Sequence, residues 1–426
     1  IVGLVSFSSV VTILAGFAGW QWQQAALEQV KSLTQSSVAL LASHQEIDAL
    51  VNALRAGNQL NYIPWPDADS QKQVRLALQQ TVYETSERNR LEGHNYSVRG
   101  VSFSPNGQMI ATASEDYTVK LWSINGEQLD SVTVQNRLLR NVAFNTDSTM
   151  IAAISEDNTI KIWGIDGQKL KEVSTVKGQD NEKNFMSGIC FIPKTNMIAA
   201  SGSGNTVKLW RINEQNHQLV KDKIIKGHNF PVWSISCSRD GKMIVTADQG
   251  GFLGLWSSDG EELIKPFQLR EKDLAIYGVS FSPDGKSIAI ARGNTTVALW
   301  SRYGKEFKRD EKNFQTLGNH NNFVTSVSFS RDGKTIASTS ADNTVKLWSF
   351  NGRELKTLQG HGDRVYSASF SPDGNTLASA GDDNTVRLWS IGDLEPKIFE
   401  GHDKAASLYS VNFSPTKVIS KKEITN

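Results

Sequence analysis

The sequence predicts an all-β fold of repeated four-stranded antiparallel blades, preceded by an α-helical N-terminal extension. Three observations support this. A tryptophan phrase of the TVKLWS type recurs, Asn-Gly and Asp-Gly turn pairs separate short apolar runs, and the residues before Leu91 show neither feature. A repeat of this period indicates units that bury their apolar faces only by stacking on their neighbours.

The tryptophan phrase defines the repeating unit. It recurs every 41 to 48 residues, at Trp122, Trp163, Trp210, Trp256, Trp300, Trp348 and Trp389. In the first unit, residues 98–107 alternate apolar and small side chains and end on an Asn-Gly turn, residues 109–114 return as a second strand, and the third strand carries the tryptophan. A second turn at 125–126 leads to a fourth strand. Such blades, packed radially around a channel, form a β-propeller with short edges.

Gly-His pairs precede several units, and an aspartate lies six residues before several of the tryptophans. The pairs are Gly93-His94, Gly227-His228, Gly360-His361 and Gly401-His402. With these features the chain resembles the WD40-repeat family from Leu91 to about Ile419. The resemblance implies a seven-bladed propeller over residues 89–426. The aspartate that the family carries after each tryptophan is replaced here by Ser, Gly or Arg, but the packing tryptophan is retained.

A partial eighth repeat follows the seven complete ones. It begins at residues 400–414, but Thr416 replaces the expected turn and no tryptophan strand follows. An eight-bladed ring, a second propeller and a truncated end all fit this pattern. Propellers usually close with a strand from one terminus, and residues 89–92 match the fourth-strand pattern of residues 397–400. We therefore favour seven blades, the usual number in the family.

Three repeats combine a histidine, an aspartate and the tryptophan. The sets are His94, Asp116 and Trp122; His320, Asp342 and Trp348; and His361, Asp383 and Trp389. A histidine oriented by a carboxylate suits a hydrolase, but a hydrolase needs one such set and this chain has three. In the resembled family these residues form a buried hydrogen-bond network. We therefore predict a structural network, no catalytic residue and no enzyme activity.

The remaining repeats lack part of this set. Blades two, three and five lack the histidine, and blades three, four and five lack an aspartate at that spacing. We expect apolar packing to hold those blades together.

Composition narrows the functional classes further. The 426 residues carry a formal net charge of +1, which gives no global field to attract nucleic acid. The two cysteines, Cys190 and Cys237, fall in first strands of different blades, and one takes the slot that Phe103 fills elsewhere. Without a CxxC motif or a histidine cluster, we predict neither a disulfide nor a metal site, and no cofactor. Both cysteines are expected to act as small buried residues.

The N-terminus has a different composition. No charge occurs from Ile1 to Trp20, a length that matches a bilayer core, and Trp20 and Trp22 suit an interfacial belt. This predicts a transmembrane helix over residues 1–20 that anchors a cytoplasmic propeller to a membrane. A signal sequence and a helix buried in a larger assembly are the alternatives.

Residues 21–88 are predicted to form a helical linker. Neither Gly nor Pro occurs between Trp20 and Ala56, and an apolar stripe of Leu40, Ile47, Leu50 and Leu54 follows one helical face. Gly57 and the Pro-Trp-Pro segment 64–66 are expected to end this helix before a second one, from Asp69 to about Arg88.

Residues 15–94 carry a second resemblance. GWQWQQA, ALRAGNQL and RLALQQTVYETSERNRLEGH, followed by WD40 repeats, are similar to the C-terminal part of large bacterial multidomain proteins. In those relatives a STAND-type (NACHT-like) NTPase or a caspase-like protease domain comes first. This chain contains neither a phosphate loop nor a Cys-His protease motif, and it starts without Met and stops within a repeat. We therefore expect a fragment that lacks the upstream domain.

The second residue of each first strand is the candidate binding position. It reads Arg99, Arg140, Ser187, Trp233, Tyr277, Thr325, Tyr366 and Tyr409. In relatives this position lies at the rim of the top opening and contacts protein or peptide partners, and Arg, Trp and Tyr dominate binding hot spots. Packing between blades is the alternative role, since aromatics also favour strands. Acidic residues Glu115, Glu156 and Asp382, each one residue before a turn aspartate, are expected to surround the top opening and to complement a basic or amine-bearing partner.

These observations favour a noncatalytic interaction platform or sensor module of a larger signalling protein. We expect Arg99, Arg140, Trp233, Tyr277, Tyr366 and Tyr409 to contact the partner. A hydrolase in the propeller channel and a membrane-anchored structural scaffold are the alternative functions.

Overall fold

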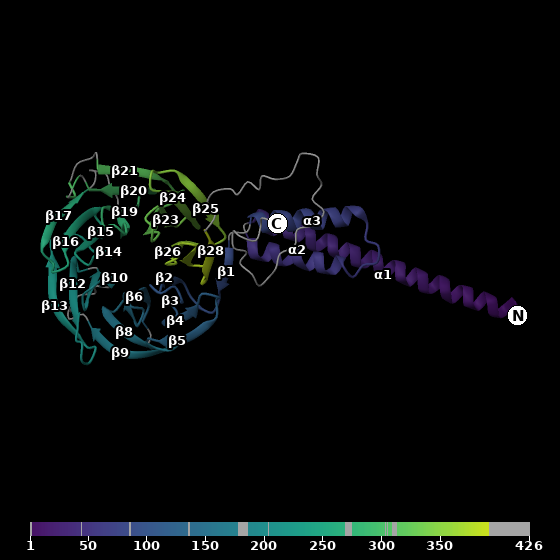
Figure 1. Ribbon diagram of the computed structural model, residues 1–426, viewed down its shortest axis with the longest axis horizontal. Helices are drawn as coiled ribbons and strands as arrows, with labels where there is room; N and C mark the ends of the chain where they lie inside the picture. The colour runs from purple at the N-terminus through teal and green to yellow at the C-terminus, as the bar shows by residue number, and fades with distance from the viewer. Residues whose placement is uncertain are drawn as a thin grey trace, which may run out of the picture. The chain divides into compact units, whose positions relative to one another are not determined.

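The architecture is a propeller joined to three helices in a computed structural model (Figure 1). The structure describes residues 2–391, apart from 44, 85–86, 135–136, 178–185, 203, 269–274, 303, 305 and 309–312; the side chains of 2–16, 82–84, 177 and 186 are also outside the description. The chain divides into two units, Ile1–Gly392 and Asp393–Asn426. The partial eighth repeat and Tyr409 lie outside the described residues.

The helices are α1 (Val2–Ala42), α2 (Glu46–Leu60) and α3 (Ala68–Glu84). Leu27 and Val30 of α1 pack with Ala56 of α2 and Val74 of α3 in a small buried cluster. The sequence predicts one helix through Ala56, but α1 ends at Ala42, where the Gln45 amide donates to the Leu40 carbonyl. The chain turns there, so two helices pack side by side instead of forming one.

Gly57 does not end α2, contrary to the prediction. A Cβ at this position would lie 3.3 Å from Leu78 Cδ1 of α3. The missing side chain lets the two helices approach closely, and α2 continues to Leu60. Glycine lowers helix propensity, but tertiary packing overrides that preference here.

The prediction of membrane association is wrong. In the described part of the chain we find no helix with the length and apolar composition that a membrane crossing requires. The prediction relied on the absence of charge from Ile1 to Trp20, which is a necessary condition for a span but not a sufficient one. No element boundary falls at residue 20, because α1 continues into the packed helices.

Each blade is a sheet of four strands, which we call the first, second, tryptophan and outer strands. The first strands are β2 (Val98–Phe103), β6 (Leu139–Phe144), β10 (Met186–Ile192), β14 (Val232–Cys237), β18 (Ile276–Phe281), β22 (Val324–Phe329) and β26 (Val365–Phe370). The second strands are β3 (Met109–Ser114), β7 (Met150–Ser155), β11 (Met197–Gly202), β15 (Met243–Asp248), β19 (Ser287–Arg292), β23 (Thr335–Ser340) and β27 (Thr376–Gly381).

The tryptophan strands and the outer strands complete the blades. The tryptophan strands are β4 (Thr118–Ser123), β8 (Thr159–Asp166), β12 (Thr206–Ile212), β16 (Phe252–Ser257), β20 (Thr296–Ser301), β24 (Thr344–Ser349) and β28 (Val386–Ser390). The outer strands are β5 (Gln128–Thr133), β9 (Lys169–Lys177), β13 (Leu219–Lys226), β17 (Glu262–Gln268), β21 (Phe314–Asn319), β25 (Glu354–Gln359) and β1 (Glu87–Leu91).

The ring closes with a strand from the N-terminal side of the propeller. Six sheets use consecutive strands, whereas the seventh has the order β1-β28-β27-β26, with Leu91 opposite Val386. The first strands contact one another around the centre, and β26 contacts β2 (Figure 1). This confirms the predicted seven-bladed propeller and the use of residues near 89–92 as its closing strand.

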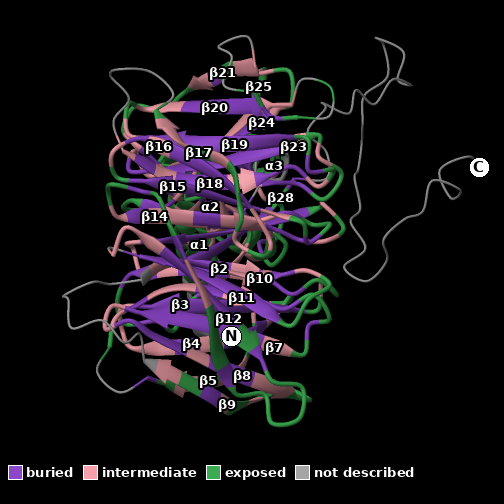
Figure 2. Cartoon of the chain, turned by 90° about the vertical axis from the view of Figure 1, so that its left-hand side faces the viewer, coloured by how far each residue is buried: buried purple, intermediate pink, exposed green. Residues whose placement is uncertain are grey.

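Six of the tryptophans pack in clusters with apolar residues of the preceding blade. Trp122 shares a buried cluster with Ala378 and Val386 of the last blade, and Trp348 packs with Val297 and Leu299 of the fifth. Comparable clusters contain Trp163, Trp210, Trp256 and Trp300. Buried residues concentrate in the strands, and exposed residues concentrate in the connecting loops (Figure 2). The core is therefore a circular series of interfaces between blades.

The two cysteines form a disulfide, so the prediction of free thiols is wrong. Cys190 of β10 and Cys237 of β14 lie on first strands of adjacent blades, with their Cα atoms 6.1 Å apart. At two other boundaries this place holds a hydrogen bond, from the Phe281 amide to Ser236 Oγ and from the Phe103 amide to Ser369 Oγ. The separation of 47 residues is about one repeat, which brings such positions together.

Gly318 provides a test of the packing between blades. A Cβ at Gly318 would lie 2.2 Å from Trp348 Cζ3, so we expect Gly318→Ala to displace the indole and lower the free energy of unfolding by about 1–3 kcal/mol. Gly164→Ala is the matched control, because its Cβ would meet Val173 Cγ1 at an ordinary 3.5 Å. Denaturant unfolding measures both, and equal effects would contradict the packing described here.

Candidate functional site

The structure brings together each predicted histidine and aspartate. The Nδ1 to Oδ2 distances are 2.8 Å for His94 and Asp116, 3.0 Å for His320 and Asp342, and 2.9 Å for His361 and Asp383. The Gly-His segment entering a blade supplies the histidine, and the turn between the second and third strands supplies the aspartate. Each pair therefore ties two loops together at one end of a blade.

A hydroxyl group connects each histidine to the tryptophan of its blade. In the sixth blade, Ser338 Oγ lies 2.7 Å from His320 Nε2 and 2.8 Å from Trp348 Nε1. An indole nitrogen can only donate, so the serine oxygen accepts from Trp348 and its proton points to Nε2. His320 therefore carries its own proton on Nδ1 and donates it to Asp342. Thr112 and Ser379 hold the same place in the first and last blades.

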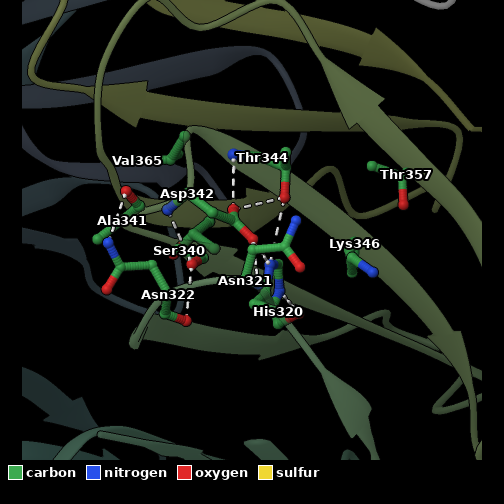
Figure 3. Close-up of polar contacts among 12 residues, drawn as sticks. His320, Asn321, Asn322, Ser340, Ala341, Asp342, Thr344, Lys346, Thr357 and Val365 are labelled. Carbon is green, nitrogen blue, oxygen red and sulfur yellow. Dashed lines mark hydrogen bonds and ion pairs between the residues drawn. The ribbon is translucent and has the colours of Figure 1, made fainter. Parts of the chain in front are cut away.

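Further donors satisfy the carboxylate of each set. Asp342 also accepts hydrogen bonds from the amides of Asn321 and Thr344 and from the Thr344 hydroxyl (Figure 3). Burial by itself would raise the pKa of the Asp342 carboxyl, but the hydrogen bonds from His320 and Thr344 outweigh it and hold that pKa well below its usual range. The pKa values of the Asp116 and Asp383 carboxyls are lowered in the same way.

Burial acts on two of the histidines in the opposite sense. It is the largest effect on the imidazoles of His94 and His361 and lowers their pKa, although the hydrogen bonds to Asp116 and Asp383 oppose it. Both ring nitrogens of each histidine already have a partner. A neutral imidazole with both nitrogens engaged has no free position to accept a proton from a substrate.

The sequence interpretation missed a fourth set in the fourth blade. His228 Nδ1 lies 2.7 Å from Asp248 Oδ2, and Thr246 bridges His228 Nε2 to Trp256 Nε1. Asp248 escaped notice because it ends β15, eight residues before the tryptophan rather than six. The bridging hydroxyl gives a better signal. In all four sets it follows the histidine by 18 residues and precedes the tryptophan by 10.

Apolar contacts replace the network in the fifth blade. Trp300 stacks on Phe314 at 5.5 Å between ring centroids and contacts Phe307 and Phe267 at 4.8 and 5.3 Å. Its Nε1 donates to the Lys308 carbonyl instead of to a strand hydroxyl. The aromatic cluster and the hydrogen-bond network are thus two ways of fixing the same indole.

Removal of a bridging hydroxyl tests the role of the network. Ser338→Ala leaves Trp348 Nε1 and His320 Nε2 buried without their partner, and we expect it to lower the free energy of unfolding by about 1–3 kcal/mol. Ser379→Ala should cost a similar amount. Ser258→Ala, at a half-buried serine whose hydroxyl makes no hydrogen bond to the described residues, serves as the control and should change stability little. A loss no larger than that of the control would contradict the structural role.

The lowered pKa values predict a pH dependence of stability. The unfolded chain binds protons at its histidines near their ordinary pKa of 6.5, whereas folded His94 and His361 resist protonation. Stability is therefore complete above about pH 6.5 and falls as the pH drops below it, with a second loss below 3.8 from the carboxylates. Melting midpoints between pH 8 and 3 should show both declines. A midpoint that rises between pH 7 and 5 would contradict the assignment.

The predicted binding residues lie at one end of the channel. They occupy the second position of the first strands, at the end where these strands begin, and we call this set the top rim: Arg99, Arg140, Ser187, Trp233, Tyr277, Thr325 and Tyr366. Tyr409, the eighth residue of the predicted series, is outside the described residues. The top rim divides into two parts with different chemistry.

The first part is an ionic arc in blades seven, one and two. Arg99 pairs with Glu115 at 2.6 Å, and its guanidinium lies 3.8 Å above the ring of Tyr366. The Tyr366 hydroxyl donates to Asp382 at 2.9 Å. Burial and this hydrogen bond raise the pKa of Tyr366, although Arg99 opposes them. Arg99 therefore bridges the boundary at which the ring closes.

The acidic residues of the ionic arc already have partners within this chain. Arg140 pairs with Glu156 in the second blade, as Arg99 does with Glu115 in the first. Asp382 accepts from Tyr366 and from the Ser97 hydroxyl. The sequence suggests that these carboxylates attract a basic partner, but each already has a neighbour of this chain.

The second part is an aromatic arc formed by Trp233, Tyr277 and Phe323 in blades four to six. The Trp233 and Tyr277 ring centroids are 5.0 Å apart, and Tyr277 stacks on Phe323 at the same distance. All three side chains are half-buried. The sequence interpretation missed Phe323, which directly precedes β22. Three contacting rings form a continuous apolar surface that stays accessible to a partner.

The described residues contain no group of three or more His, Cys, Asp or Glu side chains placed to hold a metal ion. The polar sets of the blades each combine one histidine with one carboxylate. The described part of the propeller is therefore a hydrogen-bonded scaffold whose top rim has an ionic part and an aromatic part.

Comparisons with known proteins agree with the geometry of the blades. A family model described as "WD domain, G-beta repeat" matches residues 85–123, 129–164, 170–211, 220–257, 266–301, 311–349 and 352–390. The chain is also similar to an uncharacterized WD repeat-containing protein, slr0143, of Synechocystis sp., with 39% identity over 88 residues. That alignment covers 20% of this chain and 7% of the relative.

Proposed function

The chain belongs to the WD40-repeat family, whose propellers typically serve as platforms for protein interactions, and we propose that its top rim binds a protein partner. The aromatic arc is the observation that carries this proposal. Tryptophan and tyrosine dominate the energetics of protein interfaces, and here they stand half-exposed and in contact.

The aromatic arc supplies affinity and the ionic arc supplies orientation. Trp233, Tyr277 and Phe323 offer an uncharged apolar surface that fits an apolar or aromatic side chain of a peptide segment. Arg99 and Glu115 neutralise each other, so a partner meets local dipoles rather than a net charge. Such complementary polar groups mainly set the register and selectivity of binding.

Contacts of the closing strand give the propeller a connection to the helices. Glu87 of β1 forms a buried ion pair with Arg387 of β28 at 2.7 Å, and its amide donates to Glu46 at the start of α2. Arg90 of the same strand lies 3.7 Å from Asp48. A binding event at the rim would act on an effector through this connection, as in the sensor module of a larger bacterial signalling protein.

The partner test uses peptides selected for binding to the wild-type chain. Selected peptides should bind Trp233→Ala and Tyr277→Ala at least about tenfold more weakly, because each substitution removes a contact of hot-spot type. Fluorescence polarisation with labelled peptides measures the affinity. Phe350→Ala, which removes another exposed aromatic, is the matched control and should leave the affinity unchanged.

Two results would contradict the proposal. One is a set of selected peptides whose affinity is insensitive to both rim substitutions. The other is an equal loss in the Phe350→Ala control, which would indicate nonspecific attraction to exposed rings. A melting midpoint within a few degrees of the wild type establishes that each variant is folded.

A further inference from the structure

A cavity of about 740 Å³ occupies the end of the channel opposite the top rim. All seven blades line it with residues from the end of the first strand or the turn that follows, such as Phe103, Ser148, Lys194, Arg239 and Pro283. The rim residues are second in these strands, whereas Phe103 is the last residue of β2. Four residues of strand span roughly 13 Å, so the cavity and the top rim are separate surfaces.

The cavity wall is apolar and its charged groups are mainly cationic. Phenylalanines and prolines from several blades form the wall. Its ionisable residues, apart from the disulfide-bonded Cys237, are Lys194, Arg239 and Arg331, with Asp147 as the one carboxylate among the lining residues. Small-molecule sites of about 300–1,000 Å³ typically combine such apolar walls with a few polar groups.

The three cations make no direct polar side-chain contact with the described residues, although Lys194 attracts the Asp240 carboxylate electrostatically. Lys194, Arg239 and Arg331 are exposed and take part in no ion pair or side-chain hydrogen bond among the described residues. The cations of the top rim differ, because Arg99 and Arg140 form ion pairs with Glu115 and Glu156. A cation without a direct polar contact beside a cavity is available to a ligand anion.

The carboxylates of the same turns are engaged locally. Asp240 accepts hydrogen bonds from the Ser238 hydroxyl and the Lys242 amide, and Asp332 accepts the equivalent pair in its own turn. Neither of the two lines the cavity. Asp147 accepts from the amide and hydroxyl of Thr149. The cations that line the cavity therefore keep hydrogen-bond donors available to a ligand.

We propose that this cavity binds a small amphipathic anion. Its apolar body would contact the phenylalanine and proline wall, and its carboxylate or phosphate head would bind Arg239 and Arg331, with Lys194 nearby. Arginine matches both head groups because its planar donors can bind two oxygens at once. The site is independent of the protein-binding rim and gives the propeller a second, small-molecule function.

The test uses 8-anilinonaphthalene-1-sulfonate, a fluorescent aromatic anion, on the full chain. We expect one tight site per chain, and the Arg239→Ala/Arg331→Ala double variant should bind the dye about tenfold more weakly. The Lys242→Ala/Lys334→Ala double variant is the matched control. It removes two exposed charges from the same turns without altering the cavity wall, and its affinity should stay within about twofold of the wild type.

Two further arms identify the parts of the ligand. The uncharged dye N-phenyl-1-naphthylamine should bind about tenfold more weakly than the sulfonate if the arginines hold the head group. Hexanoate and hexyl phosphate should displace the sulfonate dye, and hexanol should not. Whichever of the two anions acts at the lower concentration identifies the preferred head group.

Four results would overturn the proposal. Equal weakening in both double variants would indicate a general charge effect, and unchanged binding in both would place the dye elsewhere. Equal affinity for the charged and uncharged dyes, or no displacement by either anion, would remove the role of the arginines. Thermal melting confirms beforehand that each double variant is folded.

Discussion

The burial of one tryptophan per blade against the preceding blade is the interaction on which the structure depends. No blade can bury its indole alone, because the apolar partners of Trp122 or Trp348 come from the neighbouring sheet. An open stack would leave one such surface exposed at its end. The pairing of β1 with β28 removes that end, so the N-terminal strand completes the blade that packs against the first tryptophan.

The polar features follow from the same burial. Leaving a buried indole nitrogen unpaired costs free energy, and in four blades a strand hydroxyl accepts its hydrogen bond and carries the hydrogen bonds on to a histidine and an aspartate. Trp210 Nε1 of the third blade is an exception, because it has no partner among the described residues. Both ring nitrogens of each histidine in the four sets take part in hydrogen bonds of the scaffold. The side chains left for recognition are those at the two ends of the first strands, where the aromatic arc and the cationic cavity occur.

The sequence was sufficient to predict the blades and three of the four histidine sets, because the residues of both recur at a fixed spacing. It failed where contacts depend on how blades sit side by side. The Cys190–Cys237 disulfide and the stacking of Arg99 on Tyr366 join residues of different blades, and local patterns do not encode that placement. Asp248 was missed because it ends β15, two residues before the place that the turn aspartates hold in the other three sets. Lack of charge alone misled the interpretation of residues 1–20.

Native-state hydrogen exchange in mild denaturant tests the closed ring most directly. A ring of equivalent interfaces has no end from which to fray, so the account predicts that amides of β2–β4 and β26–β28 open with the same free energy as those of the central blades, together with β1. Markedly faster exchange in the first and last blades than in the third to fifth would show an open stack and contradict the account.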